Sequence, residues 1–166
     1  MKISLKAGAL VVGIAAGVGL VVPLALPVGA ALKSSVACKK ESTPPLANNK
    51  VKSTVSMCTP AQLSAGGTSV SSVKPGQKKG TLTDTITWKN GKGTTVATVS
   101  FATTTKGKCK APYDSRVKIT GSVKSATGAA AKITKKGEPV AAFICAITKG
   151  AKTGQTTLET GTTFKL

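Results

Sequence analysis

Apolar and polar residues alternate along two segments of the chain that flank an Asn-Gly pair. In residues 81–88 every second residue is a threonine, and in residues 97–101 Thr98 and Ser100 separate apolar neighbours. A period of two is typical of strands that bury one face. The pair Asn90-Gly91 favours a type I′ turn. The pattern therefore predicts a β-hairpin over residues 81–104.

The turn also sets the register of this hairpin. A two-residue turn pairs Ile86 with Thr95, Asp84 with Ala97, and Leu82 with Val99. The apolar faces of the two strands then coincide, whereas a slip of one residue would place them on opposite sides of the sheet. Asp84 falls on the apolar face. We interpret it as a structural acid, hydrogen-bonded near a strand end or paired with a lysine, and keep a functional acid as the alternative.

Further strand patterns follow the hairpin. The segment 140–147 is apolar on both faces and is the candidate central strand. Residues 129–134 form either a strand or a helical turn. Strands separated by Gly and Pro at this spacing predict an all-β fold, either an antiparallel β-sandwich of immunoglobulin type or a small barrel. The remaining strands are expected at residues 117–123, 156–159 and 162–166.

The segment before the hairpin has a different composition. Residues 33–79 contain no aromatic residue and are rich in Ser, Thr, Lys, Gly and Pro. We interpret residues 31–79 as a partly ordered arm with an edge strand, best placed at residues 51–58, and residues 65–80 as a loop. The β-rich domain is then expected over residues 80–166.

The first 32 residues resemble a targeting signal. Lys2 and Lys6 precede 26 uncharged residues, and small residues follow where a signal peptidase would cleave between Ala30 and Ala31. One alternative is an uncleaved membrane-anchor helix reaching residue 32, since about 20 apolar residues span a bilayer. The other alternative is lipidation of Cys38. The leading interpretation is an exported protein whose mature chain begins at Ala31.

The four cysteines predict two disulfide bonds in an oxidising compartment. Four cysteines can pair in three ways. We favour the local pairs Cys38–Cys58 and Cys109–Cys145. A metal site is the alternative, but the chain has no histidine and no C-x-x-C spacing. We expect no bound metal and no cofactor.

Charge and missing residue types bear on function. The chain has 24 basic and 5 acidic residues, and removal of the leader lysines leaves a charge of about +17. All basic residues but Arg116 are lysines, which favours diffuse attraction to polyanions over specific reading of phosphates or bases. Without histidine the commonest general base is missing. No nucleophile elbow, Walker loop or dinucleotide fingerprint is present, so we do not expect an enzyme.

These features give three hypotheses of function. The first is a non-catalytic, exported or envelope-associated domain that anionic envelope polymers or lipid head groups retain. The second is a carrier of an apolar small molecule or lipid, and the third is nucleic-acid binding, which the lack of aromatic residues among the lysines disfavours. We expect a monomer. The candidate anion-binding residues are Lys106, Lys108, Lys110, Arg116 and Lys118.

The C-terminal half resembles a loose family of small exported actinobacterial proteins. The resemblance lies in Thr85-Ile86-Thr87-Trp88-Lys89-Asn90-Gly91-Lys92, in Cys109, and in the segments 117–123, 137–145 and 160–166. Members share a leader, an I-T-W-x-N/D-G hairpin and a predicted β-sandwich. The resemblance implies export and an all-β fold, and it implies no catalytic residue and no ligand.

Overall fold

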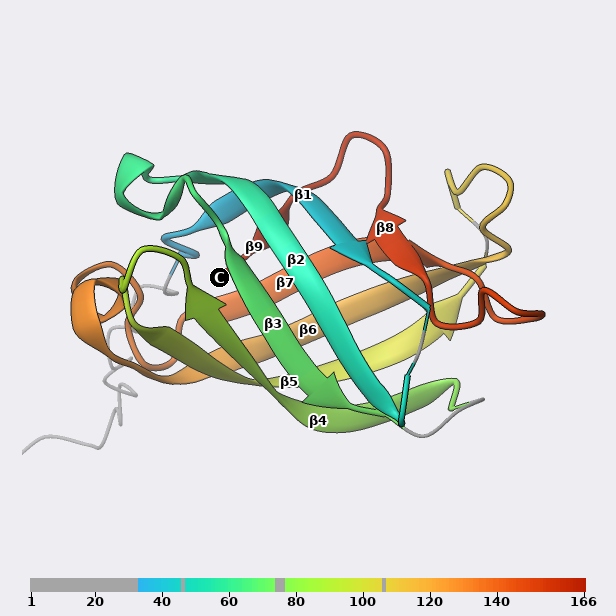
Figure 1. Ribbon diagram of the computed structural model, residues 1–166, viewed down its shortest axis with the longest axis horizontal. Helices are drawn as coiled ribbons and strands as arrows, with labels where there is room; N and C mark the ends of the chain where they lie inside the picture. Colours follow the sequence, from blue (N-terminus) through green and yellow to red (C-terminus); the bar gives the residue numbers. More distant parts are fainter. Residues whose placement is uncertain (1–32, 46, 74–76, 106) are drawn as a thin grey trace, which may run out of the picture. The chain divides into compact units, whose positions relative to one another are not determined.

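The chain forms a closed antiparallel β-barrel in a computed structural model (Figure 1) that describes residues 33–45, 47–73, 77–105 and 107–166. Of the two expected all-β architectures, the small barrel is therefore the one formed. The leader, the cleavage site at Ala30 and Ala31 and the anchor-helix alternative lie outside the described residues. The strands are β1 (Ala37–Thr43), β2 (Lys50–Thr59), β3 (Gly67–Ser72), β4 (Lys79–Trp88), β5 (Thr94–Thr104), β6 (Ser115–Ala126), β7 (Pro139–Ala146), β8 (Thr156–Leu158) and β9 (Phe164–Lys165).

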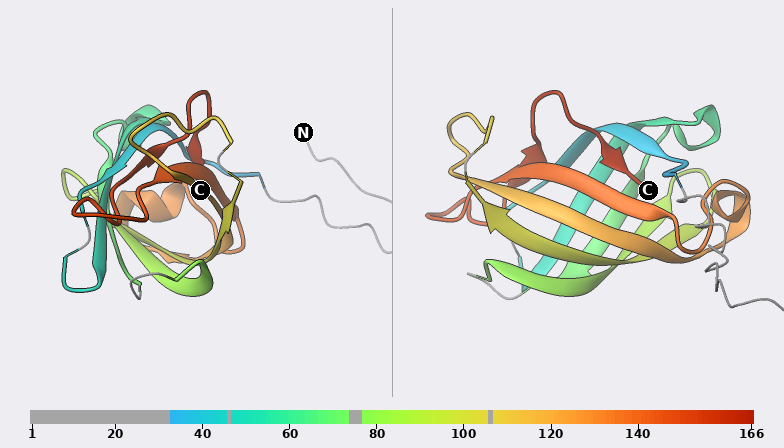
Figure 2. Two further views of the ribbon diagram at one scale, coloured as in Figure 1. Left: turned by 90° about the vertical axis from the view of Figure 1, so that its right-hand side faces the viewer. Right: turned by 180° about the vertical axis from the view of Figure 1, so that it is seen from behind.

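The topology is an up-and-down meander with one interrupted position. Each strand from β1 to β7 pairs antiparallel with the next one. Both β8 and β9 pair antiparallel with β7 and with β1, so together they fill the eighth position and close the ring. Figure 2 shows this ring from one end. Closure pairs every strand on both sides, and a barrel of eight strands is just wide enough to hold one small ligand.

The hairpin of β4 and β5 has the predicted register. Leu82 pairs with Val99, Asp84 with Ala97, and Ile86 with Thr95. Asn90 and Gly91 adopt positive φ angles of 57° and 66°, as the type I′ turn requires. The expectation from alternation and turn chemistry is thus confirmed.

The predicted division at residue 79 is corrected. Residues expected to form an arm supply β1, β2 and β3, and the described residues from Lys33 to Leu166 belong to one compact unit. The strand at residues 51–58 is present within β2, but it is not an edge, because β1 and β3 pair with its two sides. The expected loop at 65–80 contains β3. Its weak apolar pattern has a physical reason, since Ser69 and Ser71 face a cavity instead of a packed core.

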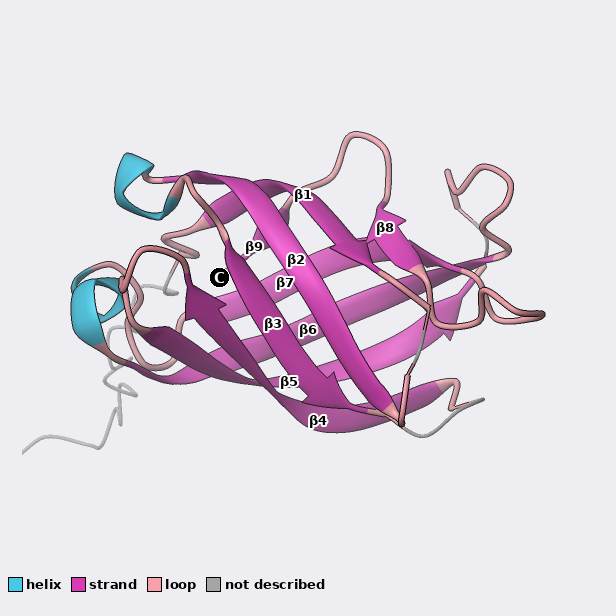
Figure 3. Cartoon of the chain, viewed as in Figure 1, coloured by secondary structure: helices cyan, strands magenta, loops and turns pink. Residues whose placement is uncertain are grey.

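The later elements agree with the pattern. The apolar run at 140–147 lies within and just beyond β7, which pairs with β6 on one side and with β8 and β9 on the other. Residues 129–134 form a helical turn, since a 3-10 helix covers Gly128–Lys132. A second 3-10 helix covers Ala61–Leu63, and both lie at the same end of the barrel (Figure 3).

A packed core fills the end of the barrel near these helices. Ile86, Trp88, Val123 and Val140 are each at most 2% exposed. The indole Nε1–H of Trp88 donates to the buried hydroxyl of Thr95 at 2.9 Å, which satisfies the one polar atom of that side chain. None of these four side chains lines the cavity, whereas other members of the core do, among them Val55, Val99 and Phe164, so the packed core continues into the cavity wall.

Both favoured disulfide pairs are present. Cys38–Cys58 joins β1 to β2 directly across the ladder, and Cys109–Cys145 joins the loop before β6 to β7. The bond at Cys38 occupies the sulfur that the lipidation alternative requires, so that alternative is corrected. Two structural disulfides indicate an oxidising, extracellular type of environment. None of the helices in the described ranges has the length and apolarity needed to cross a membrane.

Candidate functional site

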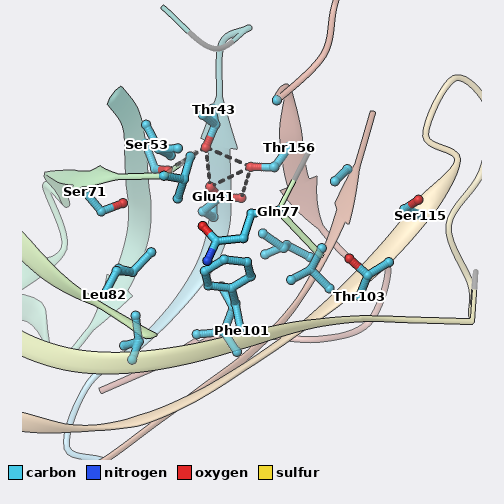
Figure 4. A pocket seen from close by; sticks show the side chains of 18 of the residues that line it. Glu41, Thr43, Ser53, Ser71, Gln77, Leu82, Phe101, Thr103, Ser115 and Thr156 are labelled. Carbon is cyan, nitrogen blue, oxygen red and sulfur yellow. Dashed lines mark hydrogen bonds between the residues drawn. The ribbon is translucent and has the colours of Figure 1, made fainter. Parts of the chain in front are cut away.

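A cavity of about 410 Å³ lies inside the barrel, beside the packed core (Figure 4). All strands of the barrel contribute to its lining. Pockets for small molecules usually measure roughly 300–1,000 Å³. Small inward-facing side chains, such as Ser53, Ser69 and Ser71, leave this space open where larger ones would fill it. The cavity is therefore the candidate binding site.

The cavity has two chemically different walls. One wall, from β5 to β7, is largely apolar and includes Val99, Phe101, Val117, Ile119 and Ile144, with Thr103 and Ser115 as its polar members. The other wall, from β1 to β4, combines apolar residues with both carboxyl groups and the other three serines of the lining. Its polar members are Glu41, Thr43, Ser53, Ser69, Ser71 and Asp84.

Glu41 is the centre of a hydroxyl network that links three strands. Its carboxylate is 6% exposed and accepts hydrogen bonds from Thr43 at 2.8 Å and from Thr156 at 3.0 Å. Thr43 in turn shares a hydrogen bond with Ser53 of β2. Figure 4 shows this network at the cavity surface. Burial raises the pKa of the Glu41 carboxyl, the hydroxyl hydrogen bonds oppose this shift, and the nearby charge of Asp84 adds to it.

Asp84 is the second carboxyl in the cavity. It is 9% exposed, and the hydroxyl of Ser69 donates to its Oδ1. Burial raises its pKa, while the hydrogen bonds from Ser69 and from the backbone N–H of Thr85 oppose the shift. The expected structural acid is thus hydrogen-bonded, but by a serine at the middle of a strand, and no lysine forms a salt bridge with it in the described part of the chain.

Two loops border the cavity at the surface. The β3–β4 loop contributes Gln77 and Lys78, and the β7–β8 loop contributes Thr148 and Lys149, all of them exposed. These lysines, Glu41 and Asp84 are the only charged residues among those that line the cavity. The site therefore places negative groups deep inside and positive groups at its entrance.

Four of the five candidate anion-binding residues lie within the described ranges, and their role stays a prediction. Lys106 lies outside the described residues, while Lys108 and Lys110 are exposed in the β5–β6 loop and Lys118 is exposed on β6. Arg116 is already engaged. Its Nε and Nη2 donate to Glu159 Oε2 at 3.0 and 2.8 Å, and its guanidinium lies 3.7 Å from the centre of the Phe143 ring. Arg116 is thus paired within the protein, and its binding of an external anion stays a prediction.

Glu159 lies at the interruption between β8 and β9 and is 3% exposed. Its Oε1 also accepts a hydrogen bond from the backbone N–H of Lys108 at 2.8 Å. This bond, followed by the bond and charge of Arg116, holds the pKa of the Glu159 carboxyl below its usual range. The carboxylate thus joins the β5–β6 loop, β6 and the break in the eighth strand position.

Burial divides the charges of the protein by sign. Four of the five carboxyl side chains are buried, and only Asp114 is exposed; the buried ones are Glu41, Asp84, Glu138 and Glu159. Every lysine in the described ranges is exposed except Lys92, which is half-buried. The outer surface is therefore more strongly cationic than the composition alone indicates.

Sequence reasoning missed Glu41 and the cavity as a whole. Glu41 follows two lysines in a short, mostly polar strand, and nothing in that local pattern distinguishes it from a solvated acid. Its partner Thr156 is 115 positions away in the sequence. Across the described ranges, no group of three or more Cys, Asp or Glu side chains is placed to hold a metal ion.

The comparisons with known proteins identify no relative. No protein-family model matches the chain, and no curated protein or solved structure matches it. The resemblance of the C-terminal half to exported actinobacterial proteins stays a prediction.

Proposed function

We propose that this protein is a non-catalytic binding protein that carries a small, largely apolar molecule in its barrel outside the cytoplasm. The observation that supports the proposal is the cavity of about 410 Å³ with its apolar wall on β5–β7. Side chains normally fill a barrel of eight strands unless it holds a ligand. Unfilled apolar space lacks the dispersion contacts of a packed core, so an apolar ligand would gain the contacts that this wall offers.

The test is a fluorescence titration with the uncharged probe N-phenyl-1-naphthylamine. We expect saturable 1:1 binding to the wild-type protein. Val117→Trp would fill the cavity from β6 and weaken binding at least tenfold, whereas Thr120→Trp adds the same ring at an exposed position of the same strand. Absence of saturable binding, or equal weakening by the two variants, would contradict the proposal. If the wild-type protein binds the probe as expected, native mass spectrometry of the exported protein would identify the natural ligand.

A second candidate function rests on the outer surface. We infer that anionic envelope polymers or lipid head groups retain the protein by diffuse electrostatic attraction. The burial of four carboxyls beneath a surface of exposed lysines supports this candidate. Such attraction decreases steeply with salt, because the Debye length falls from about 10 Å at 0.1 M to 3 Å at 1 M.

Cosedimentation with purified cell walls across a salt series tests this second function. We expect retention at low salt and release at high salt. A lack of retention at every salt concentration would contradict it and would leave the binding of a ligand in the barrel unaffected. The two functions are compatible, since one uses the interior of the barrel and the other its surface.

A further inference from the structure

We propose that the ligand of the barrel carries a protonated amine, which Glu41 and Asp84 bind inside the cavity. This inference rests on the proposed function, and it names the ligand class as an organic cation with an apolar body. It goes beyond cavity size, because the arrangement of buried charge selects among apolar molecules of similar volume.

The first support is the position of the two carboxyls. Glu41 lies on β1 and Asp84 on β4, and both are more than nine-tenths buried and line the cavity. Ser53 of β2 and Ser69 of β3 lie on the wall between them. A ligand in the cavity would therefore meet both acids and their hydroxyl partners on one side and the apolar wall on the other.

The second support is that neither carboxyl has a charged partner. The one salt bridge within the described ranges joins Arg116 to Glu159. Hydroxyls donate to the carboxyl of Glu41 and to Oδ1 of Asp84, and the backbone N–H of Thr85 also bonds the Asp84 carboxyl, so the hydrogen-bond partners of both acids are neutral. Hydroxyls satisfy acceptor atoms without neutralising a charge, and a buried charge is costly unless it is paired. A bound ammonium group would supply the missing positive charge.

The two lysines at the cavity entrance oppose a cationic ligand less than the two acids favour it. Lys78 and Lys149 are exposed in water at the entrance, where salt screens them within about 8 Å at physiological ionic strength. Deep in the cavity, the two acids would repel a carboxylate or phosphate. An uncharged ligand would leave the acids unpaired. The cation is therefore the occupant that the charge distribution fits best.

The binding should depend on pH in one direction. Glu41 on β1 and Asp84 on β4 must be ionised to pair with the amine, and burial raises the pKa of both carboxyls in the empty protein. The remaining charged lining groups are Lys78 and Lys149 on the two entrance loops. As the pH falls through the raised pKa values, the acids take up protons and the amine is released. An acidic medium would therefore unload the carrier.

The experiment compares three probes that share one tail. Octylamine, octanol and octanoate are titrated into the full exported protein at pH 7.5 by calorimetry. We expect octylamine to bind at least tenfold more tightly than the other two, and its binding to weaken as the pH is lowered from 7.5 to 4.5. The double variant Glu41→Gln, Asp84→Asn should lose this preference while it still binds octanol.

The control is Glu138→Gln, which removes a carboxyl that is 3% exposed and outside the cavity, where it accepts a hydrogen bond from Ser35. This variant should keep the preference for octylamine. Equal binding of the three probes, or an unchanged preference in the folded double variant, would overturn the inference and leave the proposed carrier function standing. Absence of binding by all three probes, together with no binding of N-phenyl-1-naphthylamine, would overturn both.

Discussion

Substitution of the buried Glu159 by glutamine should destabilise the barrel. The carboxylate accepts hydrogen bonds from the Lys108 backbone and from two nitrogens of Arg116, at 2.8, 3.0 and 2.8 Å. A glutamine oxygen can replace only part of this acceptor capacity, and its amide would face the donors of Arg116.

The magnitude follows from burial. Removal of one partner of a fully buried ion pair costs about 3–5 kcal/mol. Glu159 is 3% exposed, but Arg116 is 25% exposed, so water can rehydrate part of the guanidinium. We therefore expect a loss of about 2–3 kcal/mol in the free energy of unfolding, at the level of one or two charged hydrogen bonds. For a domain of this size that loss lowers Tm by roughly 10 °C.

The pH dependence of the free energy of unfolding distinguishes the loss of the Glu159 charge from a loss of packing. The folded-state pKa of Glu159 is lowered, so its ionised form stabilises the fold above the ordinary pKa of glutamate and this contribution is lost as the pH falls through the lowered value. Urea unfolding of wild type and Glu159→Gln should therefore differ most at pH 7. The difference should shrink at pH 3, where protonation weakens the wild-type interaction.

Two results would refute this reasoning. A difference below about 0.5 kcal/mol at pH 7 would place Glu159 among ordinary surface substitutions. A difference that stays constant down to pH 3 would show that packing, and not the carboxylate charge, is lost. Arg116→Lys is the matched variant, since it keeps the positive charge but removes the forked donors and the contact with Phe143, and it should also destabilise the protein.

Three further predictions concern the interior and the ladder. Replacement of Cys38 and Cys58 by alanine should cost about 3 kcal/mol, because the bond closes a loop with a sequence separation of 20 residues; urea unfolding measures this, and a loss below 1 kcal/mol would contradict it. Glu41→Gln and Asp84→Asn should each stabilise the protein without ligand at pH 8 relative to wild type, because a raised folded-state pKa makes wild type lose stability as the pH rises. This advantage should decrease towards pH 4. Thermal unfolding at the two pH values measures it, and an advantage independent of pH would argue against burial as its cause. Gly121→Ala should destabilise by about 1–3 kcal/mol, because a Cβ there would clash with the backbone carbonyl oxygen of Thr98 on β5, and an unchanged Tm would show that the strands separate easily.

Local chemistry explains which parts of the fold could be predicted. The β4–β5 hairpin depends on a two-residue turn and on alternation over about ten residues, and its register was predicted pair by pair. The same patterns failed for β3, where Gly67, Ser69 and Ser71 occupy the inward positions. Alternation of apolar and polar residues is visible only when the inward residues are apolar. A strand that lines the polar side of a cavity can have polar inward residues, so it shows no such alternation.

The sequence by itself indicated an all-β, strongly cationic chain with two disulfide bonds and favoured their local pairing, because composition, turn residues and cysteine spacing act over short distances. Only the tertiary structure decided that β1 meets β8 and β9 to close a barrel, since these contacts join residues more than a hundred positions apart. Closure brings Glu41 to Thr156 and places it with Asp84 in one cavity. The position of these buried acids in one cavity therefore depends on long-range strand pairing, which no local pattern of residues encodes.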